Sequence, residues 1–355
     1  MSVKWGVIGA GGIAARRTIP EGLAASDRCA LAAVMDSDAG RAQAVAGKFG
    51  VPHWYTDVDR LLAHPGLQAV YIATPNHLHK EQAVAAARAG KHVLVEKPMA
   101  LTLADAEAMI EACRQNGVRL MVGYMMRFHA HHRRLKQMID AGDLGQVVFG
   151  RAQLTCWYPP IPGAWRQDPA LGGGGAYMDM GTHCLDLLEM LVGPARSVAA
   201  HARALTHSYP VDDSSTVLVE FESGAQGVVD ANYNIADEVS QNVLEIRGTR
   251  GAVYADHTIG QDSGGNMTAY LSGDANGYDA AQARSGGGAQ KIVVEPINIY
   301  RAEVEHLSDC IEQESTLCIN DAIPINDGES GLHSLRLALL VYESARTGKV
   351  MRLDA

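Results

Sequence analysis

Short apolar runs alternate with helix-like segments through the first 122 residues of the chain. The strands that this pattern predicts are Val3–Ile8, Ala30–Met35, Ala69–Ala73, Val93–Glu96 and Arg119–Val122. The helices that it predicts are a first one behind Ile8, then Ala39–Phe49, Asp57–Ala63, Leu78–Ala89 and Leu103–Asn116. Strands that alternate with helices in this way are typical of a right-handed, mostly parallel, doubly wound sheet.

The pattern changes after Gly123. A helix is expected over Arg127–Ala141, and two more over Ile299–Ile311 and Gly328–Ala345. Between them we predict the strands Val147–Thr155, Ser197–Ala204, Ser215–Phe221, Gln226–Tyr233 and Asn242–Arg247. Short polar turns join these strands, which favours antiparallel hairpins in an open sheet with helices on one face only. Residues 260–290 are rich in Gly, Ser, Asp and Asn, so we expect irregular hairpins or a mobile loop there.

Length and charge narrow the choice of protein class. A chain of 355 residues suits two domains, which we place at residues 1–122 and 123–355. The formal net charge is −10 and the basic residues form no long run, which argues against a nucleic-acid partner. No apolar run reaches the roughly 20 residues that span a bilayer, and no signal peptide is expected ahead of the first strand. The six cysteines show no Cys-x-x-Cys spacing, so we expect reduced thiols in a cytoplasmic protein.

A glycine-rich turn follows the first strand. Gly9-Ala10-Gly11-Gly12-Ile13-Ala14 fits the G-x-G-x-x-G/A pattern of dinucleotide-binding turns, with a strand before it and a helix behind it. Gly9 permits the tight turn, Gly11 lets a pyrophosphate approach the backbone, and Ala14 allows the helix to pack closely. The free N–H groups of the helix then favour phosphate. The turn therefore predicts a nicotinamide dinucleotide as cofactor.

An acidic residue at the end of the second strand bears on the choice between NAD and NADP. Asp36 lies where a carboxylate would accept hydrogen bonds from the adenosine ribose hydroxyls, and it would repel a 2′-phosphate. This favours NAD. Arg41 follows five residues later and could meet a 2′-phosphate, although an exposed helix arginine explains it equally well. NADP therefore stays open.

The stretch Glu96-Lys97-Pro98 stops the strand that begins at Val93. Proline fixes its φ angle and lacks a backbone donor, so the strand cannot continue through Pro98. Lys97 is thereby presented at the carboxyl end of a strand, where ligands bind in open parallel sheets. A surface lysine at a turn is the alternative for an isolated Lys-Pro pair, but here the chain also carries the glycine-rich turn.

A second glycine-rich stretch, Gly172–Gly175, precedes a predicted helix that bears Asp179, His183 and Asp186. These three side chains are spaced i, i+4 and i+7, on one helical face. The glycines would leave the start of the helix uncovered, so that a ligand could approach it. A lone helical histidine is more often structural, and Asp179 one turn earlier is the feature that favours chemistry.

Three histidines lie close together on the helix predicted over Arg127–Ala141. His129, His131 and His132 suggest a metal site, but no carboxylate or cysteine stands at ligand spacing. We therefore interpret them as part of a solvated, basic helix face and expect no metal.

Taken in order, these motifs resemble those of the Gfo/Idh/MocA oxidoreductases, which include glucose–fructose oxidoreductase and inositol dehydrogenase. The resemblance covers nearly the whole chain and includes Thr74-Pro75-Asn76-x-x-His79. It implies an N-terminal Rossmann domain and a C-terminal, substrate-binding α/β domain whose open, mostly antiparallel sheet serves as the interface of a homodimer or homotetramer. The run from Trp157 to Arg166 is locally similar to 1,5-anhydro-D-fructose reductases, which favour NADPH and lack an acid at the position of Asp36.

The resemblance also implies roles for particular residues. Lys97, Asp179 and His183 would line the catalytic pocket. The residues that would bind the cofactor are Gly9, Gly11, Gly12, Ile13, Asp36, Ser37, Arg41, Thr74, Asn76, His79, Glu96, Lys97, Trp165 and Arg166. The residues that would bind a sugar or polyol are Lys97, Tyr124, Arg127, Tyr158, Asp179 and His183, with His129, Trp165, Arg166 and Asp186 as further candidates.

Hydride transfer between a secondary alcohol and a nicotinamide ring needs a group that moves the hydroxyl proton and a group that polarises the oxygen. His183 suits the first task because imidazole titrates near neutral pH. Lys97 can stabilise a developing alkoxide, and Asp179 can hold His183 or bind a substrate hydroxyl. We expect Lys97 and His183 to act on one substrate oxygen, and either can be the principal acid and base.

Two other functions remain open at this point. An NAD-dependent glycoside hydrolase of the same superfamily would oxidise a sugar transiently, expel a leaving group and show no net change of the nicotinamide. A non-catalytic dinucleotide-binding regulator would need only the first glycine-rich turn. The presence of Lys97, Asp179 and His183 together argues against the regulator and favours a dehydrogenase or reductase acting on a CH–OH group of a sugar, sugar derivative or cyclitol.

Overall fold

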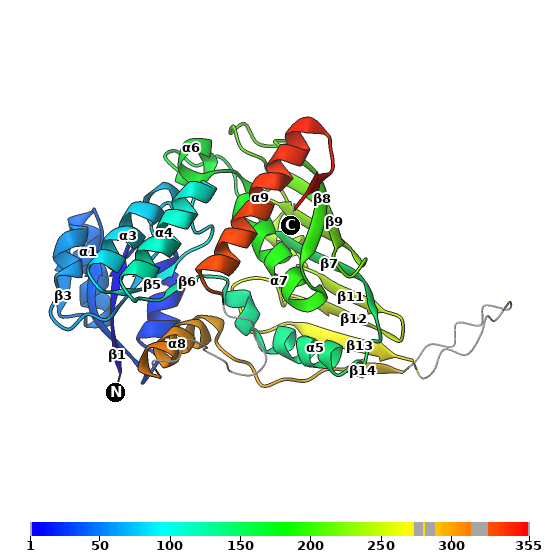
Figure 1. Ribbon diagram of the computed structural model, residues 1–355, viewed down its shortest axis with the longest axis horizontal. Coiled ribbons are helices and arrows are strands. Elements are labelled where there is room, and N and C mark those ends of the chain that lie inside the picture. The colour runs from blue at the N-terminus through cyan, green and yellow to red at the C-terminus, as the bar shows by residue number, and fades with distance from the viewer. Residues whose placement is uncertain (1, 273–279, 281–287, 314–325, 354–355) are drawn as a thin grey trace. The chain divides into compact units, whose positions relative to one another are not determined.

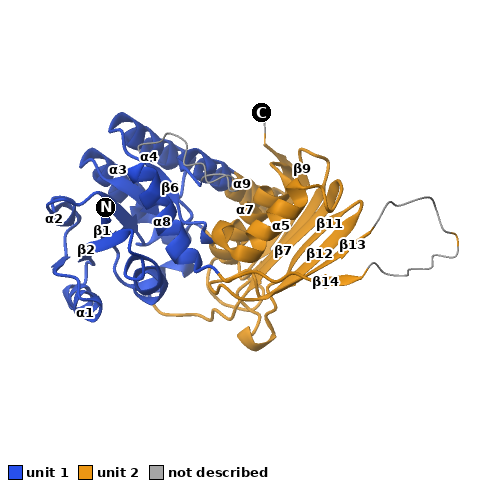
Figure 2. Ribbon diagram, turned by 90° about the horizontal axis from the view of Figure 1, so that it is seen from below, with its two compact units in different colours: residues 1–125, 163–173, 297–336 blue, residues 126–162, 174–296, 337–355 orange. Residues whose placement is uncertain are grey.

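The computed structural model describes residues 2–272, 280, 288–313 and 326–353, and the chain forms two compact units. Unit 1 contains residues 1–125, 163–173 and 297–336, and unit 2 contains residues 126–162, 174–296 and 337–355 (Figure 2). The first passage between the units falls three residues after the single boundary expected from the sequence. The chain then returns to unit 1 twice, so the two segments that return pack with the N-terminal part of the chain.

Unit 1 is built on a six-stranded sheet in which every pair of neighbours is parallel. The order is β3-β2-β1-β4-β5-β6, which places the reversal of strand order between β1 and β4. This confirms the doubly wound sheet. The strands are β1 (Val3–Ile8), β2 (Cys29–Met35), β3 (His53–Tyr55), β4 (Ala69–Ile72), β5 (His92–Val95) and β6 (Leu120–Val122).

The apolar pattern explains why these segments form central strands. All four residues of β4 are buried, as are three of the four in β5, which is what a parallel strand covered on both faces requires. The sequence pattern does not predict β3, because its three residues are polar or aromatic and two of them are exposed. Its neighbour β2 carries the hydrophobic signal instead.

Helices flank this sheet, including those that the sequence predicts behind β1 and over residues 39–49, 57–63, 78–89 and 103–116 (Figure 1). The helix behind β1 is π-helical rather than α-helical, and Ala24 N donates to Ile19 O five residues back. The helices of unit 1 are η1 (Ala14–Leu23), α1 (Ala39–Phe49), α2 (Val58–Leu62), η2 (Asn76–Leu78), α3 (His79–Arg88), α4 (Leu103–Gln115), η4 (Trp165–Gln167), α6 (Pro169–Gly172) and α8 (Ile299–Glu312). Helix α9 (Gly328–Thr347) begins in unit 1 and ends in unit 2.

Helix α8 belongs to unit 1, although the sequence placed it in the second domain. The indole Nε1 of Trp5 on β1 donates to Ser308 Oγ at 3.1 Å, and Asn298 Nδ2 donates to Glu21 Oε2 at 2.8 Å. These contacts join α8 and its N-cap to β1 and η1, so a segment nearly 300 residues away completes the cover of the Rossmann sheet.

Unit 2 is built on a nine-stranded sheet of order β14-β13-β12-β11-β7-β10-β9-β8-β15. Neighbouring strands are antiparallel except β7 and β10, which are parallel. The strands are β7 (Val147–Thr155), β8 (Ala195–Arg203), β9 (Ser214–Phe221), β10 (Gln226–Asn232), β11 (Leu244–Gly248), β12 (Gly251–Asp256), β13 (Asn266–Leu271), β14 (Ala289–Lys291) and β15 (Met351–Arg352). The open, mostly antiparallel sheet is confirmed, and β13 and β14 form a hairpin pairing within the region expected to be irregular.

Helices cover one face of this sheet. Within unit 2, α5 (Ala130–Asp140), α7 (Thr182–Val192) and the end of α9 lie on the same side, as Figures 1 and 2 show. Two short helices, η3 (Met125–Phe128) and η5 (Tyr177–Gly181), precede α5 and α7, and η6 (Asp237–Val239) follows β10. Along β9, Val217 and Val219 are buried while Leu218 between them is exposed. The alternation follows from one covered and one uncovered face.

The three histidines near the start of α5 are buried, so the expectation of a solvated basic face is wrong. His132 contacts Met126 O through Nδ1 at 2.8 Å and Thr258 Oγ1 through Nε2 at 3.2 Å, which ties α5 to the segment after β12. His129 caps the helix by accepting from His131 N. Burial lowers the pKa of His129 to about 4 and of His132 to about 3, so both rings are neutral at pH 7. Both ring nitrogens of His132 have partners inside the fold, which lowers the cost of burying a neutral imidazole.

Two further expectations concern cysteines and membranes. Cys29, Cys113, Cys156 and Cys184 are free thiols, as expected, whereas Cys310 is disulfide-bonded, so the expectation of reduced cysteines fails at that position. Among the described residues, no helix is both long and apolar enough to cross a bilayer.

Candidate active site

The residues expected to bind the cofactor all fall within unit 1. Most of them follow the carboxyl ends of β1, β2, β4 and β5, which in a parallel sheet meet along one edge. Trp165 and Arg166 come from η4, one of the segments that return to this unit. One folded body therefore contains the whole predicted cofactor set.

The first glycine-rich turn passes very close to the neighbouring strand end. A Cβ on Gly9, whose φ is +86°, would stand 2.8 Å from both Ala73 O and Thr74 Cγ2. Gly12 has a φ of +50°, and a Cβ there would meet nothing within 4 Å. No side chain of the described residues caps η1 at Ile13. The turn thus brings the backbone to the switch point, the place between β1 and β4 where the strand order reverses. It leaves space above Gly12, which fits a dinucleotide phosphate.

Asp36 lies at the end of β2 and is 5% exposed. Its Oδ2 accepts from Gly11 N at 3.2 Å, and its Oδ1 accepts from Asp38 N at 3.0 Å and from Arg41 Nη1 at 3.1 Å. Arg41 is half exposed and lies beside Gly11, where a Cβ would come within 2.8 Å of its Cδ. Asp36, which favours NAD, and Arg41, which could meet the 2′-phosphate of NADP, therefore form an ion pair with each other. Ser37, next to Asp36, is exposed.

The loop after β4 is held by buried side chains. Asn76 Nδ2 donates to Gly172 O at 2.8 Å, which connects this loop to α6. The ring of His79 is fully buried between two carbonyls, Thr74 O at 2.9 Å and Pro98 O at 3.0 Å. Burial lowers the pKa of His79 to about 4, so the ring is neutral and donates to one carbonyl at a time. His79 therefore links the loops after β4 and β5, and its predicted contact with a cofactor stays a prediction.

The turn after β5 rests on a buried carboxyl group. Lys97 N donates to Glu96 Oε2 at 3.3 Å, and the Lys97–Pro98 peptide is cis. Tyr71 donates its hydroxyl proton to Glu96 Oε1 at 2.5 Å and accepts from Thr18 Oγ1 at 3.0 Å. Burial raises the pKa of Glu96, and the neighbouring Lys97 opposes that rise. Thr18 and Tyr71 thus hold the side chain of Glu96, the residue that precedes Lys97.

A second buried acid, Glu303 on α8, lies in the same unit. It is 1% exposed, and within the described residues its Oε1 has no hydrogen-bond partner. Burial raises its pKa well above the usual range, and the nearby Glu96 adds to the rise. Burial and the neighbouring Glu96 therefore both favour the neutral form of the Glu303 carboxyl group, because an unpaired carboxylate is costly in a protein interior.

Two residues on η4 extend the same region of unit 1. The guanidinium of Arg166 stacks over the Trp165 ring, with its Cζ 4.2 Å from the ring centroid. The charge of Arg166 acts on Glu96, where it lowers the carboxyl pKa. Tyr124, just beyond β6, is 2% exposed. The local similarity that suggested Trp165 and Arg166 thus points to side chains near the Glu96–Lys97 turn.

In unit 2, Asp179 lies on the π-helical turn η5 and His183 on the first turn of α7. Isolated π turns occur frequently at functional sites. The hydroxyl of Tyr233 donates to Asp179 Oδ2 at 2.7 Å. Sequence reasoning missed Tyr233, because it stands at the end of β10 and only the folded sheet brings it to η5. His183 is 5% exposed.

Two further predicted residues of unit 2 have structural partners. Arg127 and Asp186 form a buried bidentate ion pair, Nε to Oδ2 at 2.8 Å and Nη2 to Oδ1 at 2.5 Å. Removing one partner of such a pair costs about 3–5 kcal/mol. The pair fastens η3 to α7, while a contact of Arg127 with substrate stays a prediction. Tyr158 packs against Tyr233, with ring centroids 4.8 Å apart.

The second glycine-rich stretch has a different purpose from the one expected. The side chain of Asp212 and the hydroxyl of Tyr342, both in unit 2, accept hydrogen bonds from the backbone at the start of η5. A Cβ on Gly175 would stand 1.9 Å from Asp212 O, and one on Gly174 would stand 2.1 Å from Tyr342 Oη. The start of this helix is therefore covered by the protein itself, and the interpretation of an uncovered approach is wrong at these two glycines.

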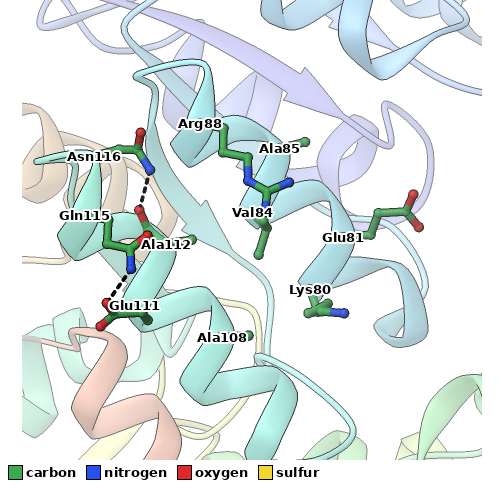
Figure 3. Close-up of a pocket in the computed structure, with 10 residues that line it drawn as sticks. All are labelled: Lys80, Glu81, Val84, Ala85, Arg88, Ala108, Glu111, Ala112, Gln115 and Asn116. Atoms are coloured by element: carbon green, nitrogen blue, oxygen red, sulfur yellow. Dashed lines mark hydrogen bonds between the residues drawn. The ribbon is translucent and has the colours of Figure 1, made fainter.

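A surface groove of about 600 Å³ runs between α3 and α4 (Figure 3). Several of its polar side chains bond within their own helix: Gln115 Nε2 donates to Glu111 Oε1, and Asn116 Nδ2 donates to Ala112 O. The groove lies between two surface helices rather than at the strand ends, so it does not belong to the candidate site. Among the described residues, no cluster of three or more His, Cys, Asp or Glu side chains is arranged to hold a metal ion.

Comparison with known proteins identifies both halves of the chain. A family model described as "Oxidoreductase family, NAD-binding Rossmann fold" matches residues 3–124. A second model, the GFO/IDH/MocA C-terminal domain, matches residues 132–254. The first matched range contains the six strands of the parallel sheet, and the second contains β7 to β11 of the sheet of unit 2.

Relatives of similar length are about 30% identical to this chain. A 1,5-anhydro-D-fructose reductase of Ensifer adhaerens is 30% identical over 99% of this chain and 98% of its own length. A D-xylose 1-dehydrogenase (NADP(+)) of Haloferax volcanii is 31% identical over 99% of this chain and all of its own. The crystal structure of an aldose-aldose oxidoreductase of Caulobacter crescentus complexed with glycerol superimposes with a TM-score of 0.86 at 30% identity, covering 99% and 100% of the two chains.

Proposed function

Because the chain belongs to the Gfo/Idh/MocA family of oxidoreductases, we propose that Lys97, Asp179 and His183 carry out its reaction on a CH–OH or carbonyl group of a sugar, sugar derivative or cyclitol. The chain is an NAD(P)-dependent oxidoreductase with an NAD-binding Rossmann domain. The observation that supports the residue assignment is the position of Lys97 at the edge of the sheet that also carries the glycine-rich turn.

The residues of unit 1 fit a nicotinamide dinucleotide. Gly9 brings the backbone to the switch point, Gly12 has open space above it, and Asp36 lies at the end of the adjacent strand. When bound, the dinucleotide supplies the hydride or accepts it. We favour NAD over NADP, because Asp36 already holds Arg41 in an ion pair and so reduces the availability of that guanidinium for a 2′-phosphate.

Lys97 would stabilise charge that develops on the substrate oxygen. The backbone N–H of Lys97 donates to Glu96, and Tyr71 and Thr18 hold Glu96 in turn. The main chain that carries the Lys97 side chain is therefore fixed. A cation that is already positioned stabilises an alkoxide without reorganisation during the reaction.

His183 would move the hydroxyl proton, and Asp179 would orient it or hold a neighbouring hydroxyl of the substrate. An imidazole can donate or accept a proton near neutral pH. Asp179 has one oxygen occupied by Tyr233 at 2.7 Å, so Tyr233 fixes the carboxylate in one orientation. We propose that His183 and Lys97 serve the same substrate oxygen.

A substrate screen tests the function. The protein is mixed with NAD or NADP and with D-xylose, D-glucose, 1,5-anhydro-D-fructose, a cyclitol or an aryl glycoside, and the reduced-nicotinamide absorbance is followed. Net change of that absorbance with a sugar or cyclitol supports the dehydrogenase. Release of the aryl alcohol without net change would instead support the glycoside hydrolase, and binding without any turnover would support the regulator.

Lys97→Ala should retain cofactor affinity and lose most turnover. Removing one group that stabilises a developing oxyanion typically lowers kcat by about 10²–10³-fold. The measurement is kcat with the best sugar of the screen, together with the NADH dissociation constant from fluorescence. Lys136→Ala is the matched control, since this lysine pairs with Asp140 on the surface of α5. Turnover of the Lys97 variant close to that of the Lys136 variant would contradict the assignment.

We also propose a cytoplasmic homodimer or homotetramer that assembles through the uncovered face of the unit 2 sheet. Leu218, Tyr254 and Tyr270 are exposed on strands whose alternate residues are buried under the helices. Tyr254 and Tyr270 already contact each other edge to face, with centroids 5.8 Å apart. Exposed apolar side chains gathered on a sheet face favour association. The molar mass in solution, measured by light scattering, tests this proposal.

A further inference from the structure

The helix that bears Asp179 and His183 begins with four consecutive backbone N–H groups that need partners. The first turn of any helix leaves such groups without an intrahelical acceptor. Ala176, at the N-cap position, provides no side-chain hydrogen bond. The first intrahelical bond runs from Asp179 N to Gly175 O at 3.0 Å. The groups that must be satisfied from elsewhere are therefore those of residues 175–178.

Asp212 satisfies three of these groups. Its Oδ1 accepts from Gly175 N at 2.8 Å, its Oδ2 accepts from Tyr177 N at 2.9 Å, and its backbone oxygen accepts from Ala176 N at 2.9 Å. The residue is 7% exposed. A carboxylate at the start of a helix is also stabilised by the helix dipole.

Tyr342, on the part of α9 that belongs to unit 2, completes the cap. Its hydroxyl accepts from Met178 N at 3.1 Å and from Gly175 N at 3.2 Å, and it donates to Asp212 Oδ1 at 2.8 Å. The ring packs edge to face against Tyr177, with centroids 5.9 Å apart. Two residues from distant parts of the chain thus satisfy four amides in succession.

The glycines before the helix make this cap possible. Any side chain at Gly174 would collide with the Tyr342 hydroxyl, and any at Gly175 would collide with the Asp212 carbonyl. Between the cap and His183 the chain forms the π turn η5, where a Cβ on Gly181 would stand 2.3 Å from the Tyr177 ring. This tight packing transmits the position of the cap to the first turn of α7.

We propose that Asp212 and Tyr342 are positioning residues that fix the orientation of Asp179 and His183 toward the substrate by clamping the start of their helix. The inference rests on the proposed function of Asp179 and His183. Asp212 is buried, and the polar atoms of both residues bond to the helix amides and to each other, so we expect the clamp to act through the helix rather than by contact with substrate. A small displacement of a catalytic group can lower the rate by about 10²-fold.

Tyr342→Phe is the main test, because it removes the hydroxyl and keeps the ring. Tyr300→Phe is the matched control, since Tyr300 is a buried tyrosine whose hydroxyl has no hydrogen-bond partner within the described residues. Asp212→Asn is the second variant, in which the new amide presents N–H donors to a backbone N–H. We expect Tyr342→Phe and Asp212→Asn to lower kcat by about 10-fold to 10²-fold, with NADH affinity unchanged.

Two readouts separate positioning from a general loss of stability. The pH dependence of kcat should shift in Tyr342→Phe but not in Tyr300→Phe, because the surroundings of His183 change in the first variant only. A pH titration of the His183 ring by NMR should show the same difference without any substrate. Hydrogen exchange at the amides of residues 175–178 should become faster in Tyr342→Phe.

The outcomes are distinct. If Tyr342→Phe folds and matches Tyr300→Phe in kcat, pH profile and His183 titration, the inference is overturned while the proposed function stands. If Asp212→Asn fails to fold, the result for Tyr342→Phe alone decides whether the clamp positions Asp179 and His183. If the wild type turns over no sugar, the proposed function fails, and the His183 titration alone decides whether the clamp sets the environment of that ring.

Discussion

The two glycine-rich stretches of this protein look alike in sequence but differ in what approaches them. In unit 1, the turn from Gly9 to Ala14 leaves open space above Gly12, and no side chain of the described residues caps the helix at Ile13. In unit 2, the start of η5 is occupied by Asp212 and Tyr342. At Gly12 the first turn leaves room for a ligand, whereas the protein's own side chains occupy the approach to the second stretch.

This difference shows what a glycine before a helix means physically. The absence of a Cβ permits a close approach to the backbone, but it does not say which group approaches. In unit 1 the answer is indicated by the switch point of a parallel sheet, where ligands bind. In unit 2 the answer depends on Asp212 and Tyr342, which lie 37 and 167 residues from Gly175.

Alanine substitution in the two stretches should have very different effects on stability. Gly175→Ala would place a methyl group against the backbone oxygen of Asp212, so we expect a loss of more than about 3 kcal/mol, the upper end of typical overpacking costs. Gly12→Ala has room, and its positive φ should cost about 1–2 kcal/mol. Urea unfolding of both variants measures the difference. Equal losses would mean that the clamp does not enclose Gly175 as described.

The central strands of both sheets could be predicted from the sequence because each depends on a local pattern. The buried runs of β4 and β5 and the alternation along β9 are visible in single segments. The first glycine-rich turn, Asp36 and the Glu96–Lys97 turn could also be found, since each lies next to the strand that positions it.

What could not be predicted depends on contacts between distant segments. The sequence around Asp212 gives no sign that it caps a helix, and Tyr233 is bonded to Asp179 only because β10 ends beside η5. The burial of His129 and His132 was missed for the same reason, because the partner Thr258 lies 126 residues away from His132. Residue type alone suggested a solvated face.

His183→Asn tests whether the helix behind the second stretch carries out proton transfer. Loss of a general acid or base typically lowers the rate by about 10²–10⁴-fold. We expect kcat to fall more than KM rises, and the pH–rate profile to become flatter near neutrality, because asparagine does not titrate. Steady-state kinetics across the pH range provide the measurement. His201→Asn, at an exposed position on β8, is the control. A variant that keeps the wild-type pH profile would exclude His183 as the titrating group.

The smallest expected effect concerns the first stretch, where the cofactor choice is decided. Asp36 accepts a hydrogen bond from Gly11 N and forms an ion pair with Arg41, so it connects the glycine-rich turn to that arginine. Among the described residues, Arg41 is the only cation that forms an ion pair with Asp36. Asp36→Ser removes the charge that would repel a 2′-phosphate and releases Arg41. A hydrogen bond to a charged group is worth about 1.5–3 kcal/mol, so the ratio of kcat/KM for NAD over NADP should fall by about tenfold or more.

The same substitution also shows whether the two stretches are independent. Because Asp36 lies in unit 1 and the clamp in unit 2, the exchange of the His183 helix amides should be unchanged in Asp36→Ser. Arg41→Ala is the companion variant: with Asp36 present it should leave the preference for NAD intact, and combined with Asp36→Ser it should remove the gain in NADP turnover. If the wild type already prefers NADP strongly, the carboxylate of Asp36 does not govern the choice. Arg41, which stands beside Gly11, would then be the residue that binds the 2′-phosphate. In that case a side chain would bind the ligand at the first stretch, as side chains cap the helix at the second.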